Sequence, residues 1–263
     1  GNSSNMQTDY DFDSKVFFSD LRNSSDIGIK AAENTLLKCN PKKINTCQLD
    51  VVFHPRVART LLSHFASLVN GSSIVRGSSF LREKLNKKIF KDEINIIDNP
   101  NIIRGLSSKP FDDEGCSMEK ISLVENGVLK NWILDTTTAK QLDMASNSRA
   151  SRGVSSPPTP SPTNMFIDNG SKSCKQLLNE VNNGFYVTDL IGQGVNLITG
   201  DYSRGASGFK IENGEISFPI NEVTIADNLN DMFNKMTIAN DLEFLYSINT
   251  PTLAIEGMTI AGV

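Results

Sequence analysis

The clearest hydrophobic pattern in the chain is helical and begins at His54-Pro55. One face of the expected helix carries four residues at spacings of four, three and four, namely Val57, Leu61, His64 and Leu68. Proline suits the first turn of a helix, so we expect the helix to begin at Pro55 and to end at Asn70-Gly71. His64 lies on or beside the apolar stripe, where a packed histidine is more common than a ligand.

Alternating apolar and polar positions predict two β-hairpins. One covers residues 208–219 and turns at Asn213-Gly214, and the other covers residues 121–134 and turns at Asn126-Gly127. An Asn-Gly pair favours a tight hairpin because both turn residues adopt positive φ angles. Further strands are expected at residues 49–53 and 94–97 and in the closing segment 238–263. Shorter helices are expected at residues 29–38, 78–85 and 175–183. Interspersed helices and hairpins favour an α+β fold, rich in β-structure, with antiparallel hairpins and several short helices.

Two polar segments interrupt these elements. Residues 1–24, with an acidic run at 9–13, are interpreted as a solvated lead-in. Residues 146–164 contain six serines and four prolines, a composition typical of a flexible connector. The alternative is an extended strap over a partner or a cleft, in which Arg149 and Arg152 contact anions.

Glycines are dense in residues 187–208, at Gly192, Gly194, Gly200, Gly205 and Gly208. This spacing predicts an irregular, turn-rich loop at residues 192–208 that leads into the hairpin at residues 208–219. A dinucleotide site is excluded because Leu197 stands where the third glycine is required, and the Gly-Lys-Ser/Thr of a P-loop is absent from the sequence. The nucleophile elbow of serine hydrolases also fails, because Phe209 stands at its closing glycine.

Composition narrows the function further. The 263 residues carry a formal net charge of −4, which argues against broad nucleic-acid binding. No apolar run in the sequence reaches membrane-spanning length. The scattered cysteines form no Cys-x-x-Cys pair, so reduced thiols and a cytoplasmic location are expected; they are Cys39, Cys47, Cys116 and Cys174.

The inventory of catalytic residue types shows no recognisable active site. The sequence has two histidines, His54 and His64, whereas a catalytic zinc site normally takes three protein ligands. The adjacent carboxylates Asp112, Asp113 and Glu114 lack the spacing of a calcium loop and are interpreted as a polar turn. An autonomous metallohydrolase that uses both histidines and these carboxylates remains an alternative, without motif support.

Several long segments together resemble the PmbA (TldE) branch of the TldD/PmbA family. They include MQTDYDF at 6–12, VVFHPRVARTLLSHF at 51–65, KPFDDEG at 109–115 and VTDLIGQGVNLITGDYSRGASG at 187–208, and the resemblance covers almost the whole chain. It implies that residues 1–263 are the β-rich C-terminal domain of such a protein. Full-length members of the family carry an additional N-terminal α/β domain, which we expect to be absent from residues 1–263.

The resemblance also implies a function. TldD-type subunits carry a zinc motif, His-Glu-x-x-x-His, whereas PmbA-type subunits lack it and pair with TldD in a heterodimer that processes or degrades unfolded peptides. The motif overlays this chain at Ser63, His64 and Leu68, so we expect no metal here and zinc in the TldD-type partner. Family members have also been linked to modulation of DNA gyrase, which leaves a regulatory binding protein as an alternative.

Under this resemblance the chain forms one wall of a protease chamber. Nine residues are candidates for the subunit interface or the peptide cleft: Arg149, Arg152, Gly192, Gly194, Gly200, Asp201, Tyr202, Arg204 and Gly205. Self-association of the isolated chain into a homodimer is a further alternative.

Overall fold

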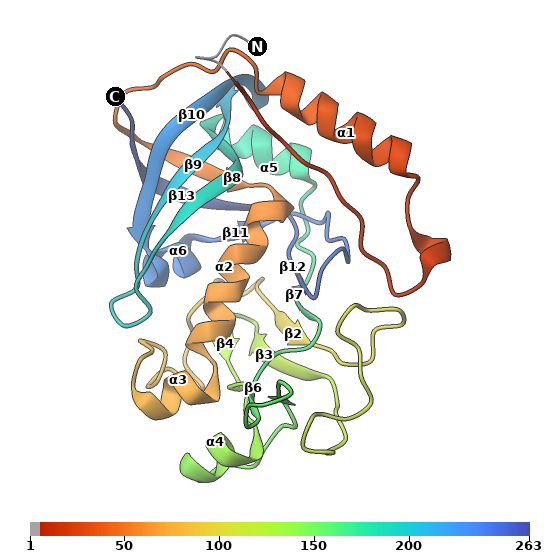
Figure 1. The fold of residues 1–263 in the computed structure, drawn as a ribbon. Helices are drawn as coiled ribbons and strands as arrows, with labels where there is room; N and C mark the ends of the chain where they lie inside the picture. Colours follow the sequence, from red (N-terminus) through yellow and green to blue (C-terminus); the bar gives the residue numbers. More distant parts are fainter. Residues whose placement is uncertain (1–5) are drawn as a thin grey trace.

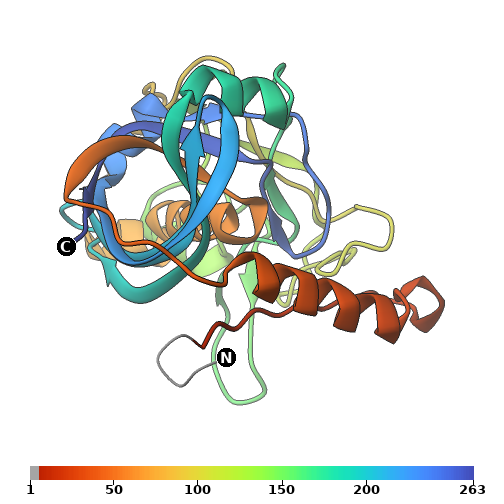
Figure 2. The same cartoon turned by 90° about the horizontal axis from the view of Figure 1, so that it is seen from above.

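The structure is a computed structural model that describes residues 6–263, so the part of the expected lead-in at residues 1–5 lies outside the described residues. Its most extensive element is a closed ring of strands, which we call the strand ring. Its members are β1 (Cys47–Phe53), β8 (Asn183–Val195), β9 (Asp201–Glu212), β10 (Glu215–Asn228) and β13 (Leu253–Ala261). The ring closes because β1 pairs in parallel with β8 and antiparallel with β13 (Figure 2). The short β11 (Thr237–Ile238) adds to β13.

The predicted hairpin at residues 208–219 is confirmed as the junction of β9 and β10. Glu212 pairs with Glu215, and both turn residues, Asn213 and Gly214, have positive φ angles of 54° and 78°. The strands continue well beyond the predicted hairpin, because β9 begins at Asp201 and β10 ends at Asn228.

The prediction of an irregular glycine-rich loop at residues 192–208 is wrong. Most of this stretch lies in β8 and β9, which pair with each other along nearly their full length. A Cβ atom at Gly208 would lie 1.9 Å from the carbonyl oxygen of Tyr186, and one at Gly194 would lie 2.0 Å from that of Ser203. Glycine is therefore needed where the two coiled strands approach each other closely.

A second, five-stranded sheet lies below the strand ring in Figure 1. Its order is β12 (Ile248–Asn249), β7 (Met165–Ile167), β2 (Ile96–Asp98), β3 (Ile121–Glu125) and β4 (Val128–Leu129). The predicted turn of the hairpin at residues 121–134 is confirmed, since Asn126 and Gly127 connect β3 to β4 and have positive φ angles.

Helix α2 (Pro55–Leu68) joins the strand ring to this sheet (Figure 1). Its apolar face is buried as predicted, with Val57, Leu61 and Leu68 in a single core cluster. The same cluster contains Phe53 of the strand ring and Leu123 of the second sheet. Full burial of a leucine contributes about 1.5–3 kcal/mol, so this helix is a main structural link between the two layers.

Two predictions about the helices near α2 are wrong. Asn70 does not close α2; its side chain accepts the Ser72 amide and begins α3 (Gly71–Arg76), which ends at Gly77 in the left-handed region. The helix predicted at 78–85 is a series of turns instead, because Ser79 bonds the local backbone at Leu81. Three further helices complete the fold: α4 (Thr136–Gln141), α5 (Cys174–Val181) at the predicted helix 175–183, and α6 (Leu229–Lys235).

The connector at residues 146–164 is anchored to the fold, so the prediction of a flexible linker is wrong. Its strands β5 (Ala150–Ser151) and β6 (Thr159–Pro160) pair with each other. Thr163 donates from its backbone and its hydroxyl to Asp98, which is also the partner of Arg149. Buried side-chain bonds of this kind hold a segment that composition alone marks as mobile.

The N-terminal segment crosses the outside of the molecule. Residues 6–15 have no regular structure, and the 3₁₀ turn η1 (Phe18–Asp20) and helix α1 (Ser24–Leu37) follow. Helix α1 lies along the outer side of the fold and contains no fully buried residue (Figure 1). The interpretation of the lead-in as solvated is wrong for Asp9, whose side chain is 3% exposed.

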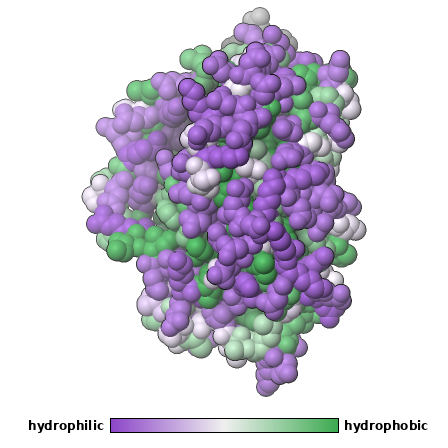
Figure 3. Space-filling model, turned by 180° about the vertical axis from the view of Figure 1, so that it is seen from behind, coloured by the Kyte–Doolittle hydropathy of each residue, from purple (hydrophilic) through white to green (hydrophobic). Residues whose placement is uncertain are grey.

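Taken together, these layers make the fold α+β and rich in β-structure, as predicted. The surface seen from behind is mainly hydrophilic, with apolar residues in small groups (Figure 3). Within residues 6–263, we find no helix that combines the length and the apolar character needed to cross a membrane.

Candidate functional site

Helix α2 begins directly after His54, and its second half contains His64 and the other two positions that overlay the zinc motif. Ser63 donates its hydroxyl to the carbonyl oxygen of Arg59 at 3.0 Å, and Leu68 is completely buried. His64 packs edge-on against Tyr202 of β9, with ring centroids 6.3 Å apart. The prediction that these residues lie on a helix is confirmed, but the sequence could not show that Tyr202 packs against His64.

His64 and Tyr202 lie in a poorly solvated environment. Within the described chain, neither His64 Nε2 nor the Tyr202 hydroxyl has a hydrogen-bond partner. Burial lowers the pKa of His64, and the nearby Arg204 lowers it further, so the imidazole is neutral at pH 7. Burial likewise raises the pKa of the Tyr202 hydroxyl well above its ordinary value.

These residues do not fit a zinc ion. Leu68 has no donor atom and belongs to the core, and the Ser63 hydroxyl is engaged by its own helix. Across residues 6–263, no three His, Cys, Asp or Glu side chains converge as metal ligands. A catalytic zinc normally requires three such ligands, so we assign no metal chemistry to this region.

The carboxylates of the alternative hydrolase serve the local backbone. Asp112 is buried and accepts the amides of Glu114, Cys116 and Ala150. Glu114 accepts the amide and the hydroxyl of Thr136. Asp113 accepts the Arg152 amide, and this bond is the first cause of its lowered pKa. The structure therefore does not bring these carboxylates together with His54 and His64 as one ligand group.

The predicted interface residues fall into two separate groups. One group lies on β8, β9 and the turn between them; it consists of Gly192, Gly194, Gly200, Asp201, Tyr202, Arg204 and Gly205. The other group, Arg149 and Arg152, lies in the connector beside the second sheet. Arg149 is fully buried and its Nε lies 2.5 Å from Asp98 Oδ2, so the prediction that it contacts an anion at the surface is wrong. A role at an interface or cleft stays a prediction for the first group and Arg152.

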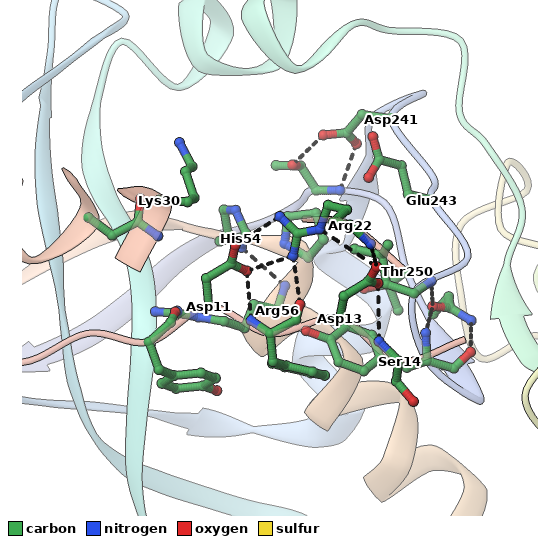
Figure 4. Close-up of a pocket in the computed structure, with 18 of the residues that line it drawn as sticks. Asp11, Asp13, Ser14, Arg22, Lys30, His54, Arg56, Asp241, Glu243 and Thr250 are labelled. Atoms are coloured by element: carbon green, nitrogen blue, oxygen red, sulfur yellow. Dashed lines mark hydrogen bonds and ion pairs between the residues drawn. The ribbon is translucent and has the colours of Figure 1, made fainter. Parts of the chain in front are cut away.

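A cavity that was not predicted lies at the start of α2. It has a volume of about 540 Å³. Its walls come from residues 10–14 of the lead-in, Arg22, Lys30 and Asn34 in and before α1, the start of α2, Tyr186 of β8, and residues 241–252 (Figure 4). Pockets for small ligands commonly enclose about 300–1,000 Å³, so this one has the size of a binding site.

A buried ionic cluster holds the lead-in against this cavity. Asp9 lies 2.7 Å from Arg56 Nη1 and 2.9 Å from Lys38 Nζ, and Arg56 also contacts Asp189 at 2.9 Å. Burial alone would raise the pKa of Asp9, but the bonds from Arg56 and Lys38 outweigh it and lower the pKa to about 2. The lead-in is thus attached by charge at a point where the sequence suggested only solvation.

His54 forms part of the cavity wall and also begins α2. Its Nδ1 accepts the Arg56 amide at 3.1 Å, so it acts as the N-terminal cap of the helix. The neutral ring must then carry its proton on Nε2. Burial, with a smaller effect of Arg56, lowers the pKa of His54 to about 4. His54 therefore offers the cavity a neutral hydrogen-bond donor at pH 7.

The sequence did contain one signal for this cavity. The acidic run in residues 9–13 alternates with the aromatic Tyr10 and Phe12, a pattern that suits an extended segment with two different faces. Phe12 indeed contacts Tyr246, with ring centroids 5.6 Å apart, and Arg56 stacks on Tyr10. The partners lie more than 40 and more than 230 positions away along the chain, a distance over which one sequence shows no pairing.

Sequence comparisons with known proteins all point to one family. Residues 46–262 match the PmbA/TldA metallopeptidase C-terminal domain. The chain is 38% identical to Metalloprotease PmbA of Escherichia coli O157:H7, covering 98% of this chain and 55% of that protein. It is 37% identical to a Metalloprotease PmbA homolog of Haemophilus influenzae, again covering 98% and 55%. The chain thus spans about half the length of these relatives.

Solved structures show the same fold. A protein described as a modulator of DNA gyrase from Bacteroides thetaiotaomicron superposes with a TM-score of 0.85 at 31% identity, covering 95% of this chain and 55% of that one. TldE from Thermococcus kodakarensis superposes with a TM-score of 0.81 at 24% identity, covering 90% and 55%. The second likeness concerns the fold alone.

Proposed function

This chain belongs to the PmbA/TldD family of metalloproteases, and on that premise we propose that it is a non-catalytic subunit of a zinc metalloprotease complex. In the proposed complex a TldD-type partner supplies the zinc and the catalytic residues. The present chain forms part of the chamber in which unfolded peptides are processed or degraded.

One observation carries this proposal: the zinc-motif positions of α2 are structural. The third position is Leu68, which lies in the core with no exposed surface, and the first is Ser63, which bonds its own helix. A chain that keeps the fold of a metalloprotease family but cannot ligate the metal at this helix fits the role of a supporting subunit.

The test is reconstitution with a TldD-type subunit that contains His-Glu-x-x-x-His. We expect no cleavage of an unfolded, quenched-fluorescence peptide by this chain alone, and cleavage when both subunits are mixed. Mixing with a partner whose motif Glu is replaced by Gln is the matched control and should abolish cleavage. Cleavage by the present chain alone would contradict the proposal and favour the autonomous hydrolase.

A second candidate function is direct regulation of DNA gyrase. It is favoured by the description of the structural neighbour from Bacteroides thetaiotaomicron as a modulator of that enzyme. Binding of purified gyrase to the isolated chain, measured without any protease partner, would support this candidate. If gyrase does not bind at micromolar concentrations and the reconstituted pair still cleaves peptide, only the role as a protease subunit remains.

A further inference from the structure

Some charged side chains that line the cavity at the start of α2 form ion pairs within the protein, and others do not. On its lead-in wall, Asp11 and Asp13 both contact Arg22, with the Asp11 Oδ2 at 2.8 Å from Nη1. Arg56 is matched by Asp9 and by a second carboxylate on β8. Lys38 contacts Asp9 and Asp189, and Lys15 contacts Asp13, so four cationic groups balance these four carboxylates and the set presents little net charge to a ligand.

Asp241 and Glu243, on the opposite wall, are not neutralised. Asp241 accepts the amide of Thr252 at 2.8 Å and its hydroxyl at 2.6 Å, which are neutral partners. Glu243 is exposed and makes no ion pair within residues 6–263. Figure 4 shows both carboxylates at the same side of the cavity. A cationic group placed there would gain charge-assisted hydrogen bonds without displacing an existing cation.

Two further polar groups border the same space. His54 carries its free proton on Nε2, as derived above, and is neutral at pH 7. Thr250 is 2% exposed, lines the cavity, and its hydroxyl has no hydrogen-bond partner within the described residues. A buried hydroxyl without a partner costs free energy, so a ligand that bonds it would gain from doing so.

The backbone of the lead-in wall is not paired with other backbone, since residues 6–16 make no backbone–backbone hydrogen bond in the structure. Aspartate side chains accept the amides of Tyr10, Phe12 and Ser14, and Arg56 and Arg22 donate to the carbonyls of Tyr10 and Phe12. A peptide would therefore pair with the backbone groups of the intervening residues. An extended peptide can pair with such a segment by strand addition. The aromatic rings of Tyr186 and Tyr246, also on the cavity wall, provide apolar and cation–π contacts.

We propose that this cavity binds an ammonium or guanidinium group of an extended peptide, with Asp241 and Glu243 as its counter-ions. The group is either the peptide's amino terminus or a Lys or Arg side chain. The assignment rests on the proposed function in taking the ligand to be a peptide, and it adds a preference for positive charge to that function.

The test is fluorescence anisotropy with the full 263-residue chain and three labelled five-residue peptides. The first is acetylated and has a central lysine, the second has norleucine in place of lysine, and the third has norleucine and a free amino terminus. We expect the lysine peptide or the free-amine peptide to bind at least about tenfold more tightly than the neutral one. The arm that shows the gain identifies which source of positive charge the cavity takes.

Two variants test whether the preference for positively charged peptides arises in this cavity. Glu243→Gln removes an exposed charge without touching the core, and Asp241→Asn removes the second; each should reduce the gain severalfold. Glu125→Gln is the matched control, since it removes an exposed carboxylate at the end of β3 in the second sheet. Equal binding of neutral and cationic peptides, or an equal loss in the control, would overturn the proposal.

This outcome is separable from that of the proposed function. If the reconstituted pair cleaves peptides but the charge preference is absent, the cavity assignment fails and the subunit role stands. If the preference is present but a TldD-type partner gives no cleavage, the subunit role fails while the binding site stands.

Discussion

The two histidines of the chain lie in different surroundings, although both rings are half-buried and pack edge-on against a tyrosine. His54 caps the helix beside a charged cavity whose walls come from several segments that are distant in sequence. His64 lies ten residues later, against Tyr202, in a region where the neighbouring positions serve packing. The comparison shows that a residue at a motif position can be structural, while the start of the same helix, outside the motif, collects the groups that suit a ligand.

The largest expected effect tests the structural half of this comparison. Leu68→Ala should reduce the free energy of unfolding by about 2–5 kcal/mol, because it leaves a cavity in the shared core. Urea denaturation followed by circular dichroism measures it. Ser63→Ala is the control on the same helix and should change stability by less than about 0.5 kcal/mol. Similar, small effects of both would mean that the motif positions are free for another role.

The ionic cluster at the other end should contribute less, and its contribution should depend on pH. Asp9→Asn should cost about 2 kcal/mol at pH 7, because the pKa of this buried carboxylate falls from 3.8 to about 2 on folding. A lowered pKa stabilises the fold above about pH 4, and that stabilisation is lost as pH falls toward 2.

Denaturation midpoints of the wild type and Asp9→Asn across pH 2–7 measure this contribution. The two curves should converge at the acid end, as the wild-type carboxylate becomes protonated. Curves that stay parallel over the whole range would contradict the ionic attachment of the lead-in.

The cap formed by His54 gives a smaller effect. His54→Ala should cost about 1 kcal/mol through loss of the bond to the Arg56 amide, and His54→Asn should recover most of it, since asparagine is a good cap. The lowered pKa of about 4 means that His54 is neutral at pH 7 and that its stabilising effect fades as pH falls from about 6.5 to 4. NMR titration of the ring protons reports both points; a midpoint near 6.5 would contradict them.

The smallest expected effect has the opposite sign. Tyr202→Phe removes a buried hydroxyl that has no partner within residues 6–263, so it should leave stability unchanged or raise it by up to about 1 kcal/mol. Thermal unfolding with a matched Tyr186→Phe variant measures it. A loss of more than about 1 kcal/mol would show that the hydroxyl has a partner, and His64 would then belong to a polar site.

Local patterns in the sequence predicted local structure well. The apolar stripe located α2, and the two Asn-Gly pairs located the turns of both hairpins. The glycines of β8 and β9 misled the prediction, because close approach of two strands and a flexible loop both favour glycine. Only the pairing of β8 with β9 distinguishes these cases, and pairing is a tertiary property.

The candidate site was much less predictable. Asp9, Arg56 and Asp189 meet from segments far apart in sequence, and each is an ordinary surface residue type when taken alone. Arg149 was also mispredicted, because the serine- and proline-rich segment around it suggested an exposed side chain. In the structure its side chain is buried against Asp98. The helix that carries Ser63, His64 and Leu68 was predicted correctly, because its apolar stripe depends on local spacing alone.

Zinc stoichiometry of the purified chain tests the central claim most directly. The chain is stripped of metal, exposed to zinc at micromolar concentration, washed, and measured by elemental analysis. The account predicts less than about a tenth of an equivalent retained, because α2 does not supply the usual three ligands. About one equivalent held tightly would contradict it and would make the chain a candidate for catalysis on its own.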